Sequence, residues 1–90
     1  MILKVVSYYD KKLGVYSNPI FLRNDSNEDI QENYRRMLAS PKVPAEYRDY
    51  DVYILGTYED KRAEFKLSEK PEYLLSMADL MIGEEKKDVA

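Results

Sequence analysis

The chain contains no cysteine and no histidine. Without cysteine it has no disulfides, thiolate metal sites or thiol nucleophiles, and this absence fits a reducing cytosol. Without histidine it lacks the commonest general base and the commonest ligand of transition metals. These absences exclude many familiar catalytic centres. We therefore expect a protein with no enzymatic activity, no cofactor and no metal.

Tryptophan is also absent, and the three glycines are scattered. Scattered glycines cannot form a phosphate-binding loop. No apolar run approaches the ~18–20 residues needed to span a bilayer. The N-terminal residues lack the charged region and small-residue cleavage site of a signal peptide. We expect no membrane association.

The carboxylates that flank the most apolar stretch are candidates for a catalytic or Mg²⁺ site. Asp49 and Asp51 precede that stretch, while Glu59 and Asp60 follow it. An acid/base pair or a Mg²⁺ site needs carboxylates that converge. These two pairs lie at opposite ends of a strand roughly 25 Å long, at ~3.3 Å per residue. Solvation of turns explains them better.

What is present indicates one small folded domain. The 90 residues are 44% hydrophobic and 34% charged, a composition typical of a globular domain. We expect a single domain over residues 1–83 and a frayed, charged tail over residues 84–90. The net charge is −3, but residues 1–23 carry +3 because Lys4, Lys11, Lys12 and Arg23 outweigh Asp10.

Four segments have the composition of strands. Asp51–Glu59 is the best candidate for a central strand, with Val52, Ile54 and Gly56 on one face and Tyr53, Leu55 and Thr57 on the other. Ile2–Asp10 and Val15–Leu22 form a hairpin whose turn places Gly14 at positive φ. Pro19 indicates an edge or a bulge in the second of these strands. Glu64–Leu67 is a short fourth strand.

Two segments have helical patterns. Ser26 is a typical N-cap with Asp29 three residues on, and it precedes a helix over Asn27–Leu38. The apolar stripe of that helix consists of Ile30, Tyr34, Met37 and Leu38. A second helix begins near Pro71 and ends at Gly83; its apolar positions are Tyr73, Leu74, Met77, Ala78 and Met81.

These elements predict an α+β fold in the order ββαββα, a four-stranded antiparallel sheet with one helix packed across it. A crossover over the first strand gives the sheet order 2-1-3-4. Both faces of the strands Ile2–Asp10 and Asp51–Glu59 carry apolar residues. The second face therefore needs the C-terminal helix or a second subunit, and we expect a homodimer.

The first hairpin holds the most suggestive polar and aromatic residues. Lysines beside aromatic rings can follow phosphates while the rings stack on bases. The alternative is a surface hairpin whose lysines discourage edge pairing. The candidate nucleic-acid-binding residues are Lys4, Tyr8, Tyr9, Lys11, Lys12, Tyr16 and Arg23.

Three segments, read in order, resemble the small nonstructural protein of gokushoviruses, the Microviridae of the chlamydial-phage type. They are Tyr8–Lys12, Tyr16–Phe21 and Asp49–Asp60, within a similarity over about residues 3–67. The part Leu55–Asp60 is the most specific. This sequence departs from the family pattern where Ile20 precedes Phe21, at Ala45–Arg48 and at the turn Lys61–Arg62.

The resemblance implies an early phage protein of the host bacterial cytoplasm rather than a virion component. It implies a role in the synthesis or packaging of a single-stranded DNA genome, with direct binding to single-stranded DNA as one mechanism. The alternative is a protein–protein module that binds a replication, procapsid or host factor. Basic residues clustered with exposed tyrosines favour DNA, whereas an apolar, tyrosine-rich sheet face favours a protein partner.

Overall fold

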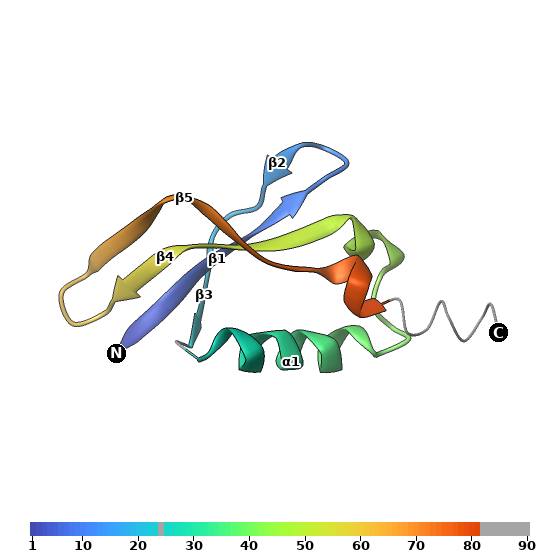
Figure 1. Ribbon diagram of the computed structural model, residues 1–90, viewed down its shortest axis with the longest axis horizontal. Coiled ribbons are helices and arrows are strands. Elements are labelled where there is room, and N and C mark those ends of the chain that lie inside the picture. The colour runs from blue at the N-terminus through green and yellow to red at the C-terminus, as the bar shows by residue number, and fades with distance from the viewer. Residues whose placement is uncertain (24, 82–90) are drawn as a thin grey trace.

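A five-stranded antiparallel sheet forms the body of the protein, and one helix lies along one side of it (Figure 1). The computed structural model describes residues 1–23 and 25–81. The elements are β1 (Ile2–Asp10), β2 (Val15–Tyr16), β3 (Ile20–Arg23), α1 (Asn27–Leu38), the 3₁₀ helix η1 (Ala45–Asp49), β4 (Tyr50–Glu59) and β5 (Glu64–Ser76). Residues 77–81 are helical. The fold is therefore α+β, as expected.

Strand β1 lies between β4 on one side and both β2 and β3 on the other, and β5 pairs with β4. These neighbours agree with the predicted arrangement. The predicted strand Val15–Leu22, however, is two strands. Regular pairing ends at Ser17: its backbone N–H still donates to the Tyr8 carbonyl at 2.8 Å, but the Tyr8 N–H donates to the Ser17 hydroxyl at 3.0 Å. Pro19 has no N–H to contribute to the ladder, so pairing resumes only at Ile20.

The turn between β1 and β2 is held by its own residues. One carboxylate oxygen of Asp10 accepts the backbone N–H groups of Lys12 and Leu13 at 2.9 and 3.1 Å. The Gly14 N–H donates to the Asp10 carbonyl at 2.7 Å. Gly14 has φ 72°, a left-handed conformation that favours glycine. The predicted turn and its glycine are confirmed.

A bulge in β4 changes the predicted faces of that strand. Val6 pairs with Ile54 and Val5 with Gly56, so Leu55 is an extra residue on β4. Because paired residues share a face, Val52 and Ile54 face α1, whereas Gly56 lies on the opposite face with Val5. The alternation drawn from sequence is therefore correct up to Ile54 and reversed from Gly56 onward. A single inserted residue has this effect because the strand repeat is two residues.

Strand β5 is much longer than the predicted Glu64–Leu67. It continues to Ser76, so Tyr73 and Leu74 are strand residues and the predicted start of the second helix is wrong. Between the pairs Gly56–Leu67 and Ile54–Glu72, four β5 residues oppose Leu55 alone. Pro71 lies in this wide bulge, where no ladder N–H is needed. The predicted helix stop at Gly83 and the tail 84–90 lie outside the described residues.

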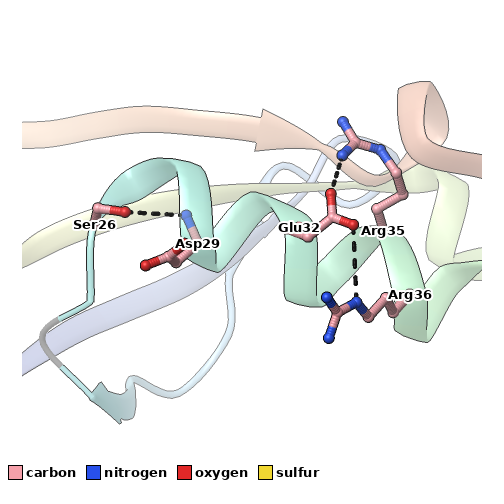
Figure 2. A network of polar contacts seen from close by, with 5 residues as sticks. All are labelled: Ser26, Asp29, Glu32, Arg35 and Arg36. Carbon is pink, nitrogen blue, oxygen red and sulfur yellow. Dashed lines mark hydrogen bonds and ion pairs between the residues drawn. The ribbon is translucent and has the colours of Figure 1, made fainter.

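Helix α1 has the predicted bounds, and its ends follow the capping and charge rules. The Ser26 hydroxyl accepts the Asp29 backbone N–H at 3.1 Å (Figure 2). Glu32 forms ion pairs with Arg35 and, at 3.8 Å, with Arg36 (Figure 2). Acidic residues in the first turn and basic residues in the last turn complement the helix dipole.

The core lies between α1 and the sheet. Ile30, Tyr34 and Leu38 are buried as predicted, whereas Met37 is exposed at the edge of the stripe. Their partners are buried side chains of the strands and the last helical turn: Val6, Val52, Ile54, Leu74, Leu75 and Met77. Each such side chain contributes about 1.5–3 kcal/mol by leaving water. Because Met77, Leu80 and Met81 also pack on this core, the described part of the second helix does not cover the opposite sheet face.

Candidate binding surface

Four tyrosines form a row on the sheet face opposite α1. Tyr16 of β2 pairs with Tyr9 of β1, and Tyr53 of β4 pairs with Tyr73 of β5. Ring centroids are 4.8 Å apart for Tyr9–Tyr16, 5.6 Å for Tyr16–Tyr53 and 5.7 Å for Tyr53–Tyr73. The last two pairs are edge-to-face, a geometry worth about 0.5–1.5 kcal/mol per pair. This tyrosine row crosses four strands and is held rigidly by the sheet.

The tyrosine row is open to solvent in the described part of the chain. Tyr16 and Tyr73, which stand on β2 and β5, are each about half exposed (46% and 56%). Tyr9 and Tyr53 are partly exposed between them. No described helix lies on this side of the sheet (Figure 1). Partly exposed aromatic rings can stack on planar groups of a ligand.

A second aromatic group, the Phe21 cluster, lies near the other end of β1 on the same face. It consists of Phe21, Tyr58 and Phe65, with centroids 5.3 Å apart for Phe21–Tyr58 and 4.7 Å for Tyr58–Phe65. Beside it is a hollow of about 500 Å³. The hollow is lined by Val5, Pro19, Phe21, Leu55, Phe65 and Leu67. All six lining residues are uncharged.

The charges beside the tyrosine row are mixed. Lys11 Nζ lies 3.3 Å from Asp51 Oδ1, which makes an ion pair but no hydrogen bond to this buried oxygen. Partial burial, Tyr16 and Asp51 raise the pKa of Tyr53. Partial burial and then Asp51 raise the pKa of Tyr73. Both phenols therefore stay neutral at physiological pH, and Asp51 offsets much of the Lys11 charge.

The structure divides the candidate residues chosen from sequence between two faces. Tyr9, Tyr16 and Lys11 lie together at the tyrosine row, and Lys12 is exposed in the adjoining turn. Lys4 lies on the α1 side, where its Nζ donates to the Asp25 carbonyl at 2.7 Å and to Asn27 Oδ1 at 2.9 Å.

Arg23 and Tyr8 are also separate from the tyrosine row. Arg23 pairs with Leu3, six residues from Tyr9 along β1, or roughly 20 Å at ~3.3 Å per residue. Its Nε lies 4.0 Å from Asp25 Oδ1. The four basic residues of the first 23 therefore do not form one patch.

Tyr8 belongs to the interior on the α1 side. Its hydroxyl lies 2.6 Å from that of Tyr34, and its ring stacks on Tyr50 at 6.4 Å. Burial, followed by the hydrogen bond to Tyr8, raises the pKa of Tyr34 well above its usual range. A pocket of about 370 Å³ between α1 and β3 adjoins this pair. Tyr8 thus joins the helix to the sheet rather than presenting a free ring.

Sequence reasoning missed half of the tyrosine row. The sequence correctly predicts Tyr53 on the face opposite Val52, but it does not link this residue to the first hairpin. It predicts Tyr73 in a helix, whereas Tyr73 lies in β5. The useful signal is the antiparallel pairing itself, because a β1–β4 pair that places Val52 opposite Tyr8 brings Tyr53 diagonally beside Tyr9.

Other kinds of site have little support from the described residues. Within residues 1–23 and 25–81, no group of three or more Asp or Glu side chains is placed to hold a metal ion. Asp60 receives the N-terminal ammonium at 2.7 Å, and Asp51 pairs with Lys11. The same part of the chain has no helix long and apolar enough to span a membrane.

Comparison with known proteins gives one result. Residues 3–80 match the family model described as Phage ORF5 protein. The comparison with curated proteins and the comparison with solved structures each yield no match.

Proposed function

The chain belongs to the Phage ORF5 protein family, and from this premise we propose that it binds single-stranded DNA during the synthesis or packaging of a phage genome. The observation that carries the proposal is the open tyrosine row across β2, β1, β4 and β5. Successive bases stack on such rings without regard to sequence, because every base has an aromatic face. The protein acts by binding alone, without enzymatic activity.

Stacking rather than phosphate contact supplies most of the affinity in this proposal. Lys11 is paired with Asp51, and Lys4 and Arg23 are distant from the row. The phosphate contacts beside the row are then Lys12 and, where a phosphate replaces Asp51 as its partner, Lys11, about two in number. Since log K for single strands falls with log salt at a slope of about −0.7 per contact, the slope should be about −1.4. The acidic net charge of −3 further limits affinity to the micromolar range.

Fluorescence anisotropy of a labelled oligothymidine at two salt concentrations tests the proposal. The double variant Tyr16→Ala, Tyr73→Ala should bind at least tenfold more weakly, since one stacked base is worth about 1–3 kcal/mol. Lys12→Glu should weaken binding and make the salt slope shallower. The control Phe65→Ala, outside the row, should bind like the parent. An absence of binding by the parent, or equal binding by the double variant, would overturn the proposal.

A protein partner is the second candidate, and the Phe21 cluster favours it. This end of the face offers an uncharged hollow with exposed Phe65 and Leu67 at its rim. An apolar side chain of a replication, procapsid or host factor would fill it. Tyr73→Leu separates the two candidates, because it removes a stacking ring from the tyrosine row and should weaken DNA binding, while a partner bound at the Phe21 cluster should bind as before.

The finer assignment follows from the resemblance of Tyr8–Lys12, Tyr16–Phe21 and Asp49–Asp60 to gokushovirus nonstructural proteins. We propose that this family member comes from a phage of that kind and acts in the host cytoplasm, where the genome is copied. Immunodetection of the protein in infected-cell lysates but not in purified virions is the expected result. Stoichiometric amounts in virions would contradict the nonstructural role.

A further inference from the structure

We infer that the aromatic sheet face is also a self-association surface, through which two copies of this chain form a weak two-fold dimer. The observation that leads to it is exposed apolar area. Phe21, Phe65 and Leu67 are 46%, 52% and 67% exposed and stand together around the uncharged hollow. Exposed apolar side chains that gather beside a hollow often mark an interaction site.

The shape of this patch points to a second copy rather than an unrelated protein. An isologous contact requires each copy to supply both a projection and a recess within one patch. Here Phe65 and Leu67 project beside a hollow whose floor includes the buried Val5. A two-fold axis near the rim would place the projections of each copy in the hollow of the other.

Charge favours the same occupant. Each copy carries a net charge of −3, so two copies repel unless they meet on a neutral surface. The residues lining the hollow are all uncharged. The Phe21 cluster contributes only two phenylalanines and one tyrosine, which also carry no charge at neutral pH. An identical copy therefore meets no charge repulsion within the hollow itself.

The sheet edges offer no competing route to self-association. The outer strand β5 is interrupted by its four-residue bulge and Pro71, and it carries Lys66, Glu69, Lys70 and Glu72. On the other side of β1, strands β2 and β3 are short and separated by Pro19. Charged, broken and short edges resist strand addition. We therefore place the dimer contact on the aromatic sheet face rather than at a sheet edge.

The available area sets the strength of the dimer. An aromatic side chain has about 200 Å² of surface, so a half-exposed one offers roughly 100 Å². The three exposed residues around the hollow, with Tyr16 and Tyr73 on the same face, therefore supply roughly 500 Å² per copy. A specific interface starts at about 500 Å² per partner. The dimer should be weak, and it must use the tyrosine row as well as the Phe21 cluster.

Sedimentation equilibrium of the full chain, from low to high micromolar concentration, tests the inference. The parent mass should rise toward twice the chain mass of 10.6 kDa. Leu67→Lys and Phe65→Ser should remain monomeric, with far-UV circular dichroism like that of the parent. The matched control Leu13→Lys changes a leucine that is 72% exposed in the β1–β2 turn, and it should associate like the parent.

Each result of these experiments supports or overturns the inferred dimer. A parent that stays monomeric at the highest concentration, or a folded Leu67→Lys or Phe65→Ser variant that dimerises like the parent, overturns the inference. If Leu67→Lys fails to fold, Phe65→Ser decides alone. Failure here is distinct from failure of the DNA proposal, because a monomer can bind the oligonucleotide and a dimer can form without binding it.

Discussion

Gly56 is the position where adding a single methyl group should destabilise the fold most. Strand β5 passes so close that a Cβ at residue 56 would lie 2.2 Å from the Lys66 carbonyl oxygen and 2.8 Å from Leu67 Cα. Both obstacles are backbone atoms, which cannot rotate aside as a side chain does. Gly56 also has φ 154°, a conformation rarely adopted by L-residues.

The cost of Gly56→Ala follows from these two terms. Overpacking costs about 1–3 kcal/mol, and a strained backbone conformation adds about 1–3 kcal/mol. We expect a loss of about 2–6 kcal/mol, against a total stability of about 5–10 kcal/mol for a domain of this size. Because β5 must move away, the rings of Phe65 and Tyr73 should lose their packing on β4.

Gly14→Ala is the matched control. Gly14 also has positive φ, but its nearest neighbour to a Cβ is the Tyr9 hydroxyl at 3.8 Å, an ordinary contact. Its loss should be about 1 kcal/mol from conformation alone. Thermal melts should show a decrease of roughly 4–8 °C for Gly14→Ala and a larger one, from about 8 °C upward, for Gly56→Ala, at about 4–8 °C per kcal/mol. Equal decreases for the two variants would refute the described approach of β5 to β4.

Three further variants test other parts of the fold. Burial raises the pKa of Tyr34 above its ordinary 10.0, so the free energy of unfolding of the parent should be highest below about pH 10 and decrease as the pH rises above it. Urea titrations at several pH values should show a smaller decrease for Tyr34→Phe. Identical decreases for the two proteins would contradict the burial of this hydroxyl. Ala63 has φ 51° in the β4–β5 turn, so Ala63→Gly should raise stability by about 0.5–1 kcal/mol, and a lower melting temperature would count against that turn. Ile30→Asp places a carboxylate in the core and should unfold the domain, which an unchanged melt would disprove.

The sequence predicts α1 well because its signals are local. The Ser26 cap, the acidic first turn and the basic last turn act within a few residues of each end. The apolar stripe follows directly from the helical repeat. Met37 is the exception, since a stripe does not specify how far the sheet extends beneath it.

The end of β5 could not be predicted, because its conformation depends on a partner distant in sequence. Tyr73, Leu74 and Met77 have a spacing that suits a helix, and Pro71 is acceptable at a helix start. Pairing of Tyr73 with Tyr53 and of Leu75 with Val52 overrides that local pattern. A bulge interrupts the two-residue repeat of a strand, so the periodicity of the sequence does not predict where a bulge lies.

The candidate site shows the same division between local and distant effects. The hairpin pair Tyr9–Tyr16 is visible in the sequence, because one turn connects its strands. The contribution of Tyr53 and Tyr73 depends on β1–β4 and β4–β5 pairing. Charge counting along the chain gave a basic patch that the fold divides, since Lys4 and Arg23 lie far from the row.

Self-association and DNA binding should compete, since both use the tyrosine row. Adding oligothymidine to the parent at high micromolar concentration should lower the average number of protein chains per particle, as measured by sedimentation. The variant Leu67→Lys, which is expected to remain monomeric, should bind the oligonucleotide at least as tightly as the parent. Simultaneous dimer and oligonucleotide binding would show that the two contacts use different surfaces.

An NMR titration of the tyrosine ring resonances with oligothymidine tests most directly whether the tyrosine row contacts the bases. All aromatic side chains are tyrosine or phenylalanine, since tryptophan is absent. We expect the rings of Tyr9, Tyr16, Tyr53 and Tyr73 to shift together and saturate at one affinity, while the interior pair Tyr8 and Tyr34 stays unchanged. Saturation without any shift of the four row tyrosines, or a titration in which no ring resonance moves, would contradict this contact.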